Sequence, residues 1–374
     1  MNKKLLVKIL LVEGIIALLA LAFIVVAIWN KPLGPALRLS TPTPQEGAVL
    51  SSPLGAIPDG SVSGTDPTPT PGSLLSQIVS KFIKPNATNK SLCDGPAVMT
   101  LLLIGSDERS EGYLYGLADS IRIVRIDFNT PSVMMVDIPR DLWVEIPGIA
   151  DHYGVTHGKL NQAYFFGNPG MGYYDGPGEG PGLLARTLEQ NFGVSVDHYL
   201  ALDIKTFVRL IDSMDGIDIY LDTEIDLNQN HDGGNPEYVL EPGSHHLDGT
   251  MALRLAMNRY PTIFQRARNQ DIVLHAIQKK LLTPAMLPKL PQLASQFSGS
   301  VQTDLSPNDI NKLLCINQQL NKDNISTVAF PDNMFTGDHA YDPYRKVNTY
   351  VLDADFNQIR TYFAEFMNGI WPIP

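Results

Sequence analysis

The feature that most constrains the fold is a set of short apolar runs between residues 97 and 139, separated by residues that favour turns. "AVMTLLLIG", Ala97 to Gly105, is almost wholly apolar and ends in glycine, as expected of a strand buried on both faces. "SIRIVRIDF" and "SVMMVDIP" follow, and the "NTP" between them predicts a tight turn at Asn129 and Thr130. We therefore predict a buried strand followed by an antiparallel hairpin.

The predicted hairpin brings two charged residues together. With the turn centred between residues 129 and 130, positions whose numbers add up to 259 lie opposite each other, to within a residue or two because Pro131 disturbs the turn. Asp119 then lies opposite Arg140. Pro139 fixes its own φ and favours an extended residue before it, which aims Arg140 at one place. We expect that place to be the neighbourhood of Asp119.

Helical patterns follow the hairpin. "GLLARTLEQNFG" and "LDIKTFVRLIDSMDG" have helical spacing of apolar residues, and "IDIYLD" after Gly216 has the alternation of a strand. Strands that alternate with helices predict a layered α/β domain, and we place a single domain at residues 93–374. The glycine-rich segment 167–182 lacks the Gly-Lys-Ser/Thr ending of a phosphate-binding loop, so we interpret it as a mobile surface loop.

The first 30 residues are of another kind. "LLVKILLVEGIIALLALAFIVVAIW", Leu5 to Trp29, is long enough to cross about 30 Å of hydrocarbon and contains only Lys8 and Glu13 as charged residues. We interpret it as one transmembrane helix, and lysines on its N-terminal side place the N-terminus in the cytoplasm. The protein is then a single-pass protein of the cell membrane with an extracytoplasmic C-terminal domain. A cleaved signal peptide is the alternative.

A segment rich in Pro, Ser, Thr and Gly, residues 31–92, joins the predicted membrane helix to the predicted domain. Ten of the 28 prolines precede Asn86, and the segment has too few large apolar residues to offset the entropy of ordering it. We interpret it as a tether. Cys93 and Cys315 are the only cysteines, and they form either a disulfide in an oxidising exterior or two buried thiols.

A cluster of arginines near one helix start indicates an anion site. Thr262 and Gln265 form a capping box, which predicts that a helix begins near Ile263. Arg266 and Arg268 then lie in the first two turns, where the positive end of the helix dipole costs each cation about 0.3–1 kcal/mol. A bound phosphate would remove the conflict, and Arg259 just before the helix adds a third guanidinium. A salt-bridged surface helix is the alternative.

Charge and composition limit what such an anion can be. The net charge of -11 excludes a nucleic-acid-binding protein, because a phosphate backbone needs a broad basic face. Asp107 follows the first predicted strand and Asp119 opens the next, and ligands of α/β sheets bind at such strand ends. If a diphosphate lies among the arginines, these carboxylates suit Mg²⁺ or another hard divalent ion such as Mn²⁺. The pattern therefore favours phosphoryl transfer, with a plain salt-bridged rim as the alternative.

Taken together, these motifs resemble the LytR-CpsA-Psr family. "LLLIGSDER", "IPRDLWVEIPG", "GKLNQAY", "FVRLIDSMDGIDI", "LEPGSHHLDGTMAL" and the arginine-bearing helix occur in the family's order between Thr100 and about Leu282. The resemblance implies a layered α/β/α domain with a mixed central sheet. It also implies an enzyme that moves an anionic glycopolymer, such as teichoic acid or capsular polysaccharide, from a polyprenyl diphosphate carrier to peptidoglycan at the cytoplasmic membrane.

The resemblance also implies roles for individual residues. Magnesium would be held by Asp107 and Asp119, the phosphates would be bound by arginines, and the polyprenyl tail would occupy an apolar cavity. The predicted catalytic residues are Asp107, Asp119, Arg140 and Arg266, and the predicted substrate-binding residues are Arg259, Arg109, Arg122, Lys159 and Asn269.

Four positions depart from the family's pattern. Ala118, Met257 and Asn269 stand where the family commonly has arginine, and Ile263 stands where it has an acid. Asn269 lies one helical turn beyond Arg266 and keeps the ability to hydrogen-bond a ligand. Two other functions therefore stay open, namely a regulatory protein that binds lipid-linked glycans without turnover and a polyprenyl diphosphate hydrolase.

Overall fold

The computed structural model describes residues 31–37, 91–107, 116–228, 234–260, 265–281 and 283–371, the last with short gaps at 290–291, 294–295 and 298–299. The predicted membrane helix, most of the predicted tether, Arg109 and the predicted helix start at Ile263 lie outside these residues. Within the described ranges, no helix has the length and hydrophobicity needed to span a bilayer.

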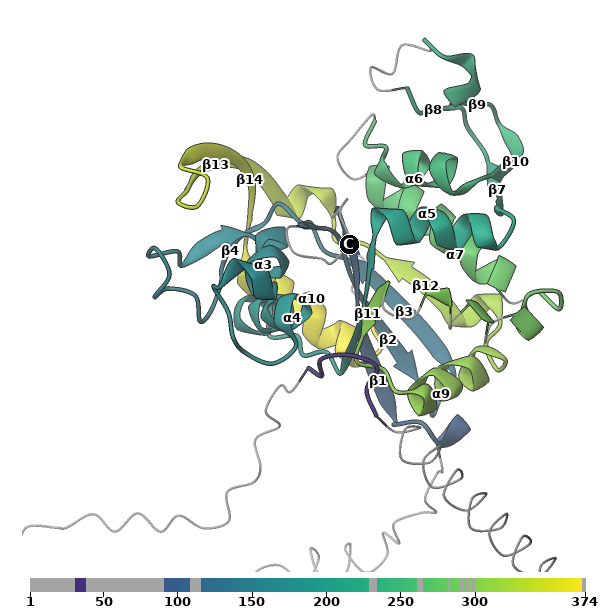
Figure 1. Ribbon diagram of the computed structural model, residues 1–374, viewed down its shortest axis with the longest axis horizontal. Helices are drawn as coiled ribbons and strands as arrows, with labels where there is room; N and C mark the ends of the chain where they lie inside the picture. The colour runs from purple at the N-terminus through teal and green to yellow at the C-terminus, as the bar shows by residue number, and fades with distance from the viewer. Residues whose placement is uncertain are drawn as a thin grey trace, which may run out of the picture. The chain divides into compact units, whose positions relative to one another are not determined.

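A six-stranded mixed sheet forms the centre of the domain (Figure 1). In spatial order its strands are β11 (Val301–Thr303), β6 (His198–Asp203), β1 (Val98–Ser106), β2 (Ala118–Asp127), β3 (Ser132–Asp137) and β12 (Ile325–Val328). β1 runs parallel to β6 and antiparallel to β2, which gives the sheet its mixed character. The predicted hairpin is confirmed with its register, since Arg122 pairs with Asp137 and Asp127 pairs with Ser132.

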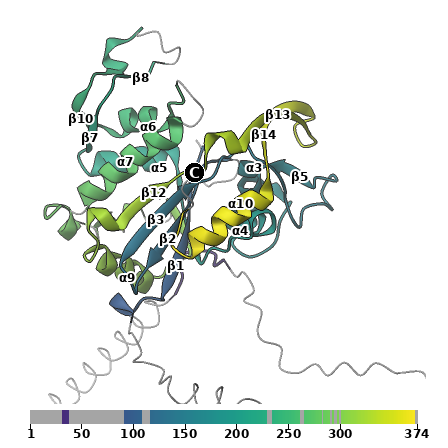
Figure 2. The same ribbon diagram turned by 180° about the vertical axis from the view of Figure 1, so that it is seen from behind.

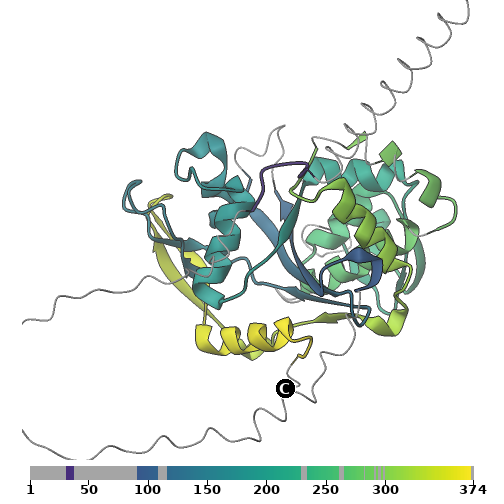
Figure 3. The ribbon, with the colours of Figure 1, turned by 90° about the horizontal axis from the view of Figure 1, so that it is seen from below.

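Helices cover both faces of this sheet, so the predicted layered architecture is confirmed (Figures 1 and 2). One side carries α3 (Leu160–Gly167), α4 (Glu179–Phe192) and α10 (Phe356–Met367), and the other carries α5 (Ile204–Ser213), α6 (Gly249–Met257), α7 (Gln265–Leu281) and α9 (Pro307–Asn317). Figure 3, the view from below, shows the sheet between these two groups. β1 is buried on both faces, which explains its unbroken apolar sequence.

The two sides of β1 and β2 carry different cores. Leu102 and Ile123, both with no exposed surface, alternate with residues that point to the opposite face. On that opposite face Leu101 and Val124 form a core cluster beneath α9. Helices α5, α6 and α7 pack above the other end of the same face, over a second cluster that includes Leu255 and Val273.

Several short strands lie outside the central sheet. The predicted strand after Gly216 exists as β7 (Ile217–Leu221), but it pairs with β10 (Gly243–Leu247) and does not join the central sheet. The other pairs are β4 (Trp143–Glu145) with β5 (His157–Lys159), β8 (Ile225–Asp226) with β9 (Val239–Leu240), and β13 (Phe335–Asp342) with β14 (Val347–Ala354). The 3₁₀ helices are η1 (Leu92–Asp94), η2 (Pro169–Met171), η3 (Pro236–Tyr238), η4 (Leu287–Lys289), η5 (Lys322–Asn324) and η6 (Asp332–Met334).

The glycine-rich segment 167–182 is packed onto the domain, whereas we predicted a mobile loop. Tyr173 is only 6% exposed, and its ring lies 4.9 Å from that of Phe166. Gly178 adopts a left-handed conformation at φ +78° and starts α4 at Glu179, three residues earlier than the apolar pattern indicates. The aromatic contacts are tertiary, so the glycine content alone did not reveal them.

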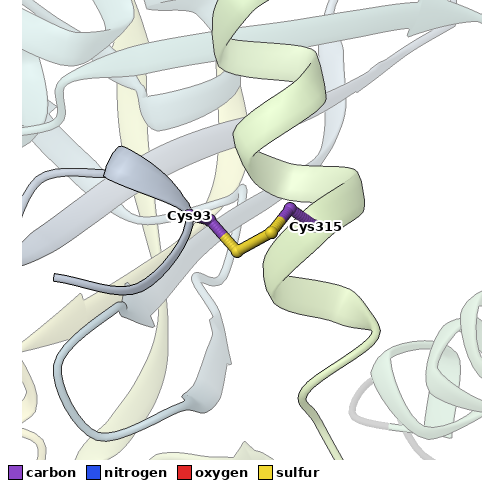
Figure 4. Close-up of a disulfide and its surroundings, with 2 residues drawn as sticks. All are labelled: Cys93 and Cys315. Carbon is purple, nitrogen blue, oxygen red and sulfur yellow. A yellow bond between two sulfur atoms is a disulfide. The ribbon is translucent and has the colours of Figure 1, made fainter.

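Two features hold the beginning of the described chain on the domain. Cys93 and Cys315 form a disulfide that joins η1 to α9, as Figure 4 shows, which decides between the two states that the sequence left open. Residues 31–37, which we assigned to the tether, lie against the sheet. The hydroxyl of Tyr199 donates to the carbonyl of Pro35 at 3.0 Å. The tether therefore does not begin at residue 31 in this structure.

Candidate functional site

A cavity of about 210 Å³ lies between the central sheet and helices α5 to α7. Its wall is mostly apolar and its polar groups gather at one end. The lining residues that carry polar or charged groups are Ser106, Asp107, Asp119, Ser120, Arg122, Asp203, Arg259, Arg266 and Gln270. An apolar cavity with a charged mouth suits a ligand that has a long apolar part and a charged head.

The sheet topology brings three carboxylates to this mouth. β1 and β6 are parallel, and Ser106 at the end of β1 lies beside Asp203 at the end of β6. β2 is antiparallel to β1 and therefore begins at the same edge, so Asp107 and Asp119 lie at one end of the sheet. The backbone N–H of Leu117 donates to Oδ1 of Asp107 at 2.5 Å, which fixes that carboxylate. This arrangement confirms that Asp107 and Asp119 line the same cavity.

Arg140 contacts Asp119 directly, as the hairpin register predicts. Its Nη1 donates to Oδ1 of Asp119, and its Nε lies 3.4 Å from Oδ2 of Asp141. The other oxygen of Asp141 accepts a hydrogen bond from Nζ of Lys159 at 2.9 Å. Arg140 and Lys159 are therefore joined through Asp141, a residue that the sequence analysis did not assign to the site although it follows Arg140 directly.

Electrostatics keep Asp141 charged. Burial alone would raise the pKa of Asp141, but the hydrogen bond from Lys159 and the charge of Arg140 outweigh it and leave the pKa below its usual value. The carboxylate thus stays ionised and holds both cations in place at neutral pH.

Arg259 and Arg266 line the cavity mouth beside Arg140. Among the described residues, neither side chain forms an ion pair within 4.0 Å. Burial, together with the charges of Arg140 and Arg259, lowers the pKa of Arg266 to about 10. Burial and Arg140 also lower the pKa of Arg259. Three guanidinium groups that repel each other in a partly buried mouth form a site that an anion would stabilise.

Arg122 differs from these three arginines because its charge is already neutralised. It lies on β2 with 1% of its surface exposed, and it forms ion pairs with Asp271 on α7 and with Asp137 on β3, the latter at 3.5 Å. Burial raises the pKa of Asp137 more than the charges of Arg122 and Arg266 lower it. Arg122 lines the cavity and ties α7 to the sheet, and its predicted contact with substrate stays a prediction.

The structure does not place Asn269, a predicted substrate-binding residue, in the lining of the cavity. Asn269 has no exposed surface and does not line the cavity, because its amide donates to the carbonyl of Asn258 at 3.2 Å and accepts from Gln265 at 3.1 Å. The next residue along the helix, Gln270, lines the cavity instead and accepts from the hydroxyl of Ser120 at 3.0 Å. The sequence analysis missed Gln270 because one helical position is a rotation of about 100°.

The departures from the family pattern have visible consequences at the mouth. Met257 is 47% exposed and lines the cavity at the end of α6, where the resemblance calls for an arginine. Ala118 is fully buried at the start of β2. The described mouth therefore has an apolar rim at Met257 beside the cations Arg259 and Arg266.

The donor set at the mouth is compatible with a hard divalent ion only if a ligand supplies further oxygens. The described residues include no group of three or more His, Cys, Asp or Glu side chains arranged to hold a metal. Asp107 and Asp119 contribute carboxylates to one cavity, and Mg²⁺ is commonly held by one or two carboxylates together with substrate phosphates. Asp107 and Asp119 fit a site in which substrate phosphates complete the coordination of the ion.

Comparisons with known proteins identify relatives of this chain. A model of the LytR_cpsA_psr family matches residues 78–360. The regulatory protein MsrR of Staphylococcus aureus (strain COL) is 28% identical over 214 residues, which are 57% of this chain and 58% of that protein. The polyisoprenyl-teichoic acid–peptidoglycan teichoic acid transferase TagU of Oceanobacillus iheyensis is 30% identical over 233 residues, 62% of this chain and 66% of that one. The chain therefore spans less than two thirds of both relatives.

The fold is shared with solved structures. The structure of TagT bound to LIIa-WTA has a TM-score of 0.54 at 20% sequence identity and covers 78% of this chain and 96% of that one. At this identity the likeness concerns the mixed central sheet and its helical layers.

Proposed function

This chain belongs to the LytR-CpsA-Psr family, and from that premise we propose that it transfers an anionic glycopolymer from a polyprenyl diphosphate carrier to peptidoglycan. The relative TagU is named as a transferase of teichoic acid to peptidoglycan. We further propose that the chain is a single-pass membrane protein whose catalytic domain lies outside the cell, because such a carrier resides in the membrane.

The observation that carries the proposal is the group of Arg140, Arg259 and Arg266 at the mouth of an apolar cavity. Two of these cations have no carboxylate within ion-pair distance in the described chain, and burial with mutual repulsion lowers the pKa of both. Guanidinium groups bind phosphate oxygens through two parallel hydrogen bonds. A diphosphate head would therefore bind at the mouth, and the polyprenyl chain would enter the apolar cavity behind it.

In the proposed reaction a hydroxyl of the acceptor attacks the phosphorus that carries the glycopolymer. A new phosphorus–oxygen bond forms to the acceptor, and the bond from that phosphorus to the bridging oxygen of the diphosphate breaks. Polyprenyl phosphate and one proton are the other products. Arg140, Arg259 and Arg266 would stabilise the charge that develops on the leaving phosphate, and a donor placed in this way is commonly worth about 2.7–4 kcal/mol.

Asp107 and Asp119 would hold the divalent ion that we propose as a cofactor. Such an ion, when bound, neutralises negative charge on the phosphates. Asp107 is oriented by the N–H of Leu117, and Asp119 is oriented by Arg140. Arg140 thus contributes both as a phosphate ligand and as the partner that positions one carboxylate. Lys159 contributes through Asp141, which it holds against Arg140.

A second function is favoured by the exposed apolar side chain of Met257 at the cavity mouth. With one cation fewer than the family pattern, the domain would bind a lipid-linked glycan and release it unchanged, and the relative MsrR is named as a regulatory protein. The two functions predict different outcomes for Met257→Arg. If the chain is a transferase, the wild type already turns over and this substitution raises its rate; if the missing cation limits the chain to binding, the wild type has no turnover and the substitution creates it.

The deciding experiment incubates the full chain in detergent with a polyprenyl diphosphate-linked glycopolymer, a divalent metal and peptidoglycan. Attachment of phosphorus-containing polymer to the insoluble wall supports transfer. Release of the sugar phosphate into water with no attachment supports a hydrolase. If neither product forms with any divalent metal, while the lipid still binds, the transferase proposal is refuted and the binding function stands.

A further inference from the structure

A row of exposed aromatic side chains lies next to the site and is used by none of the steps above. A shallow, open hollow between β4, β5 and β13 is lined by Trp143, Thr156, His157, Tyr341 and Pro343. Tyr341 is 58% exposed and Tyr350 on the neighbouring strand is 42% exposed. We call this surface the aromatic platform, defined by Trp143, His157, His339, Tyr341 and Tyr350.

The platform begins at the candidate site. In the β4–β5 pair Trp143 lies opposite Lys159, and Glu145 lies opposite His157. Paired residues and residues two apart share one face of a strand pair, so these four side chains project from the same side. Lys159 also holds Asp141 at 2.9 Å, and Asp141 is bonded to Arg140. A ligand on this face would therefore extend from the phosphate-binding arginine along Trp143.

Hydrogen bonds fix the platform to the site. The backbone N–H of Leu352 on β14 donates to the carbonyl of Asp141 at 2.8 Å. Asp342, only 2% exposed, accepts from Nε2 of Gln162 at 2.8 Å, and Gln162 in turn accepts from the N–H of Lys159 at 2.7 Å. Tyr341 and Pro343 flank Asp342 in the chain. Their position is thus set by buried contacts to the same residues that position Lys159.

The aromatic rings continue along the β13–β14 ribbon with a regular spacing. His339 pairs with Tyr350, and their ring centres are 5.9 Å apart. His339 and Tyr341 are two residues apart on one strand, so they project from one face at a spacing of about 7 Å. Exposed rings placed in a row on a rigid ribbon present flat apolar surfaces to a linear ligand.

We propose that the aromatic platform binds the acceptor, an extended chain of β-linked amino sugars, which rests on the proposed function above. The flat faces of pyranose rings carry C–H groups that stack on aromatic rings, and the hydroxyl and imidazole groups of Thr156 and His157 can hydrogen-bond a sugar. The hollow has no Lys or Arg in its lining and the protein carries a net charge of -11, so a polyanion is disfavoured there. The proposed lipid donor would bind in the cavity, whose lining residue Asp119 contacts Arg140.

The test measures binding of the full chain in detergent to a β-1,4-linked hexamer of N-acetylglucosamine by calorimetry. Tyr341→Ala should weaken this binding by about ten-fold, which is the lower end of the effect that loss of one stacking ring has on nucleobase ligands. Tyr341→Phe keeps the ring and should bind as the wild type does. Tyr220→Ala is the matched control, because Tyr220 is 66% exposed on β7 and lies outside the platform.

Either of two results would overturn the platform: binding that is unchanged in Tyr341→Ala, or binding that Tyr220→Ala weakens to the same extent. Failure of the proposed function gives a different pattern. Arg140→Ala should lose transfer and keep hexamer affinity, and Tyr341→Ala should raise KM for the acceptor without changing donor affinity. If the wild type binds the hexamer but transfers no glycopolymer, the proposed transferase function is refuted, while the proposal that the aromatic platform binds the acceptor sugar chain is retained.

Discussion

Replacing Arg140 with alanine is the most direct perturbation of the candidate site. The substitution removes one guanidinium that we propose contacts the leaving phosphate, and a preorganised donor of this kind contributes about 2.7–4 kcal/mol to the transition state. The rate constant kcat should therefore fall by about two to three orders of magnitude. The loss of the partner that orients Asp119 adds to this effect, because Asp119 accepts from Arg140 directly.

The same substitution should leave the domain folded. Asp141 keeps its hydrogen bond from Lys159, and the side chain of Asp119 is 28% exposed, so water can solvate it. The free energy of unfolding should fall by about 1–3 kcal/mol, which is smaller than the roughly 5–15 kcal/mol of a typical domain. The Arg140→Ala variant should therefore lose activity while it stays folded.

The assay compares initial rates of glycopolymer transfer with urea unfolding curves for the full chain. Arg186→Ala is the control, because Arg186 lies on α4 with its guanidinium 5.8 Å from the ring of Tyr174 and away from the cavity. Arg140→Lys keeps the charge without the two-pronged geometry and should fall between wild type and Arg140→Ala. A transfer rate of Arg140→Ala within about three-fold of wild type would refute the role assigned here.

Three further predictions concern stability, pH and metal. The disulfide between Cys93 and Cys315 joins residues 222 apart in the sequence, so its reduction should lower the free energy of unfolding by about 2–5 kcal/mol. A urea midpoint that does not change when reductant is added would contradict this prediction. Burial and like charges lower the pKa of Arg266 to about 10, and a diphosphate binds the charged form of this side chain. The affinity for diphosphate should therefore fall as pH rises through about 10. A constant affinity up to about pH 11, measured by calorimetry, would count against the site. A divalent metal should raise diphosphate affinity in the wild type and not in Asp107→Asn, and equal affinities with metal and with chelator would exclude the proposed ion.

The sequence predicted the parts of the site that depend on short-range geometry. A turn of known position sets the register of a hairpin, and that register placed Arg140 beside Asp119 before any tertiary contact was considered. Likewise, Asp107 lies at a strand end because the apolar run before it must be buried. Each of these inferences needs only local rules, since a strand has a fixed rise and a two-residue alternation.

Residues on the arginine-bearing helix were predicted less well because a helix turns by about 100° per residue. The resemblance indicates a polar contact at Asn269, which is buried against Asn258, whereas the adjacent Gln270 lines the cavity. Arg122 was named as a substrate-binding candidate because it lies close to Asp119 in the sequence. Its partner Asp271 comes from a helix about 150 residues away in the sequence, and nothing local to Arg122 indicates that pairing.

The aromatic platform lay beyond sequence analysis because it is assembled from two distant segments. Trp143 belongs to β4 and Tyr341 to β13, and they meet because β14 is bonded to the carbonyl of Asp141 and Asp342 is bonded to Gln162. Individually, a half-buried Trp143 and an exposed Tyr341 carry no information about a ligand. A row becomes visible only when the strand pairing is known.

The short segment from Asp137 to Trp143 determines where two substrates can meet. Its middle residue Arg140 contacts Asp119 at the cavity mouth, and the next residue, Asp141, uses its side chain to hold Lys159 and its carbonyl to hold β14. A donor bound at the mouth and an acceptor bound on the platform would therefore approach each other across only two residues. If that holds, shifting the platform relative to the site by weakening the contact of Gln162 with Asp342 should reduce transfer while both substrates still bind. We expect Gln162→Ala to lower kcat with little change in the affinity for either substrate, because a small misplacement of reacting groups slows the chemical step more than it weakens binding.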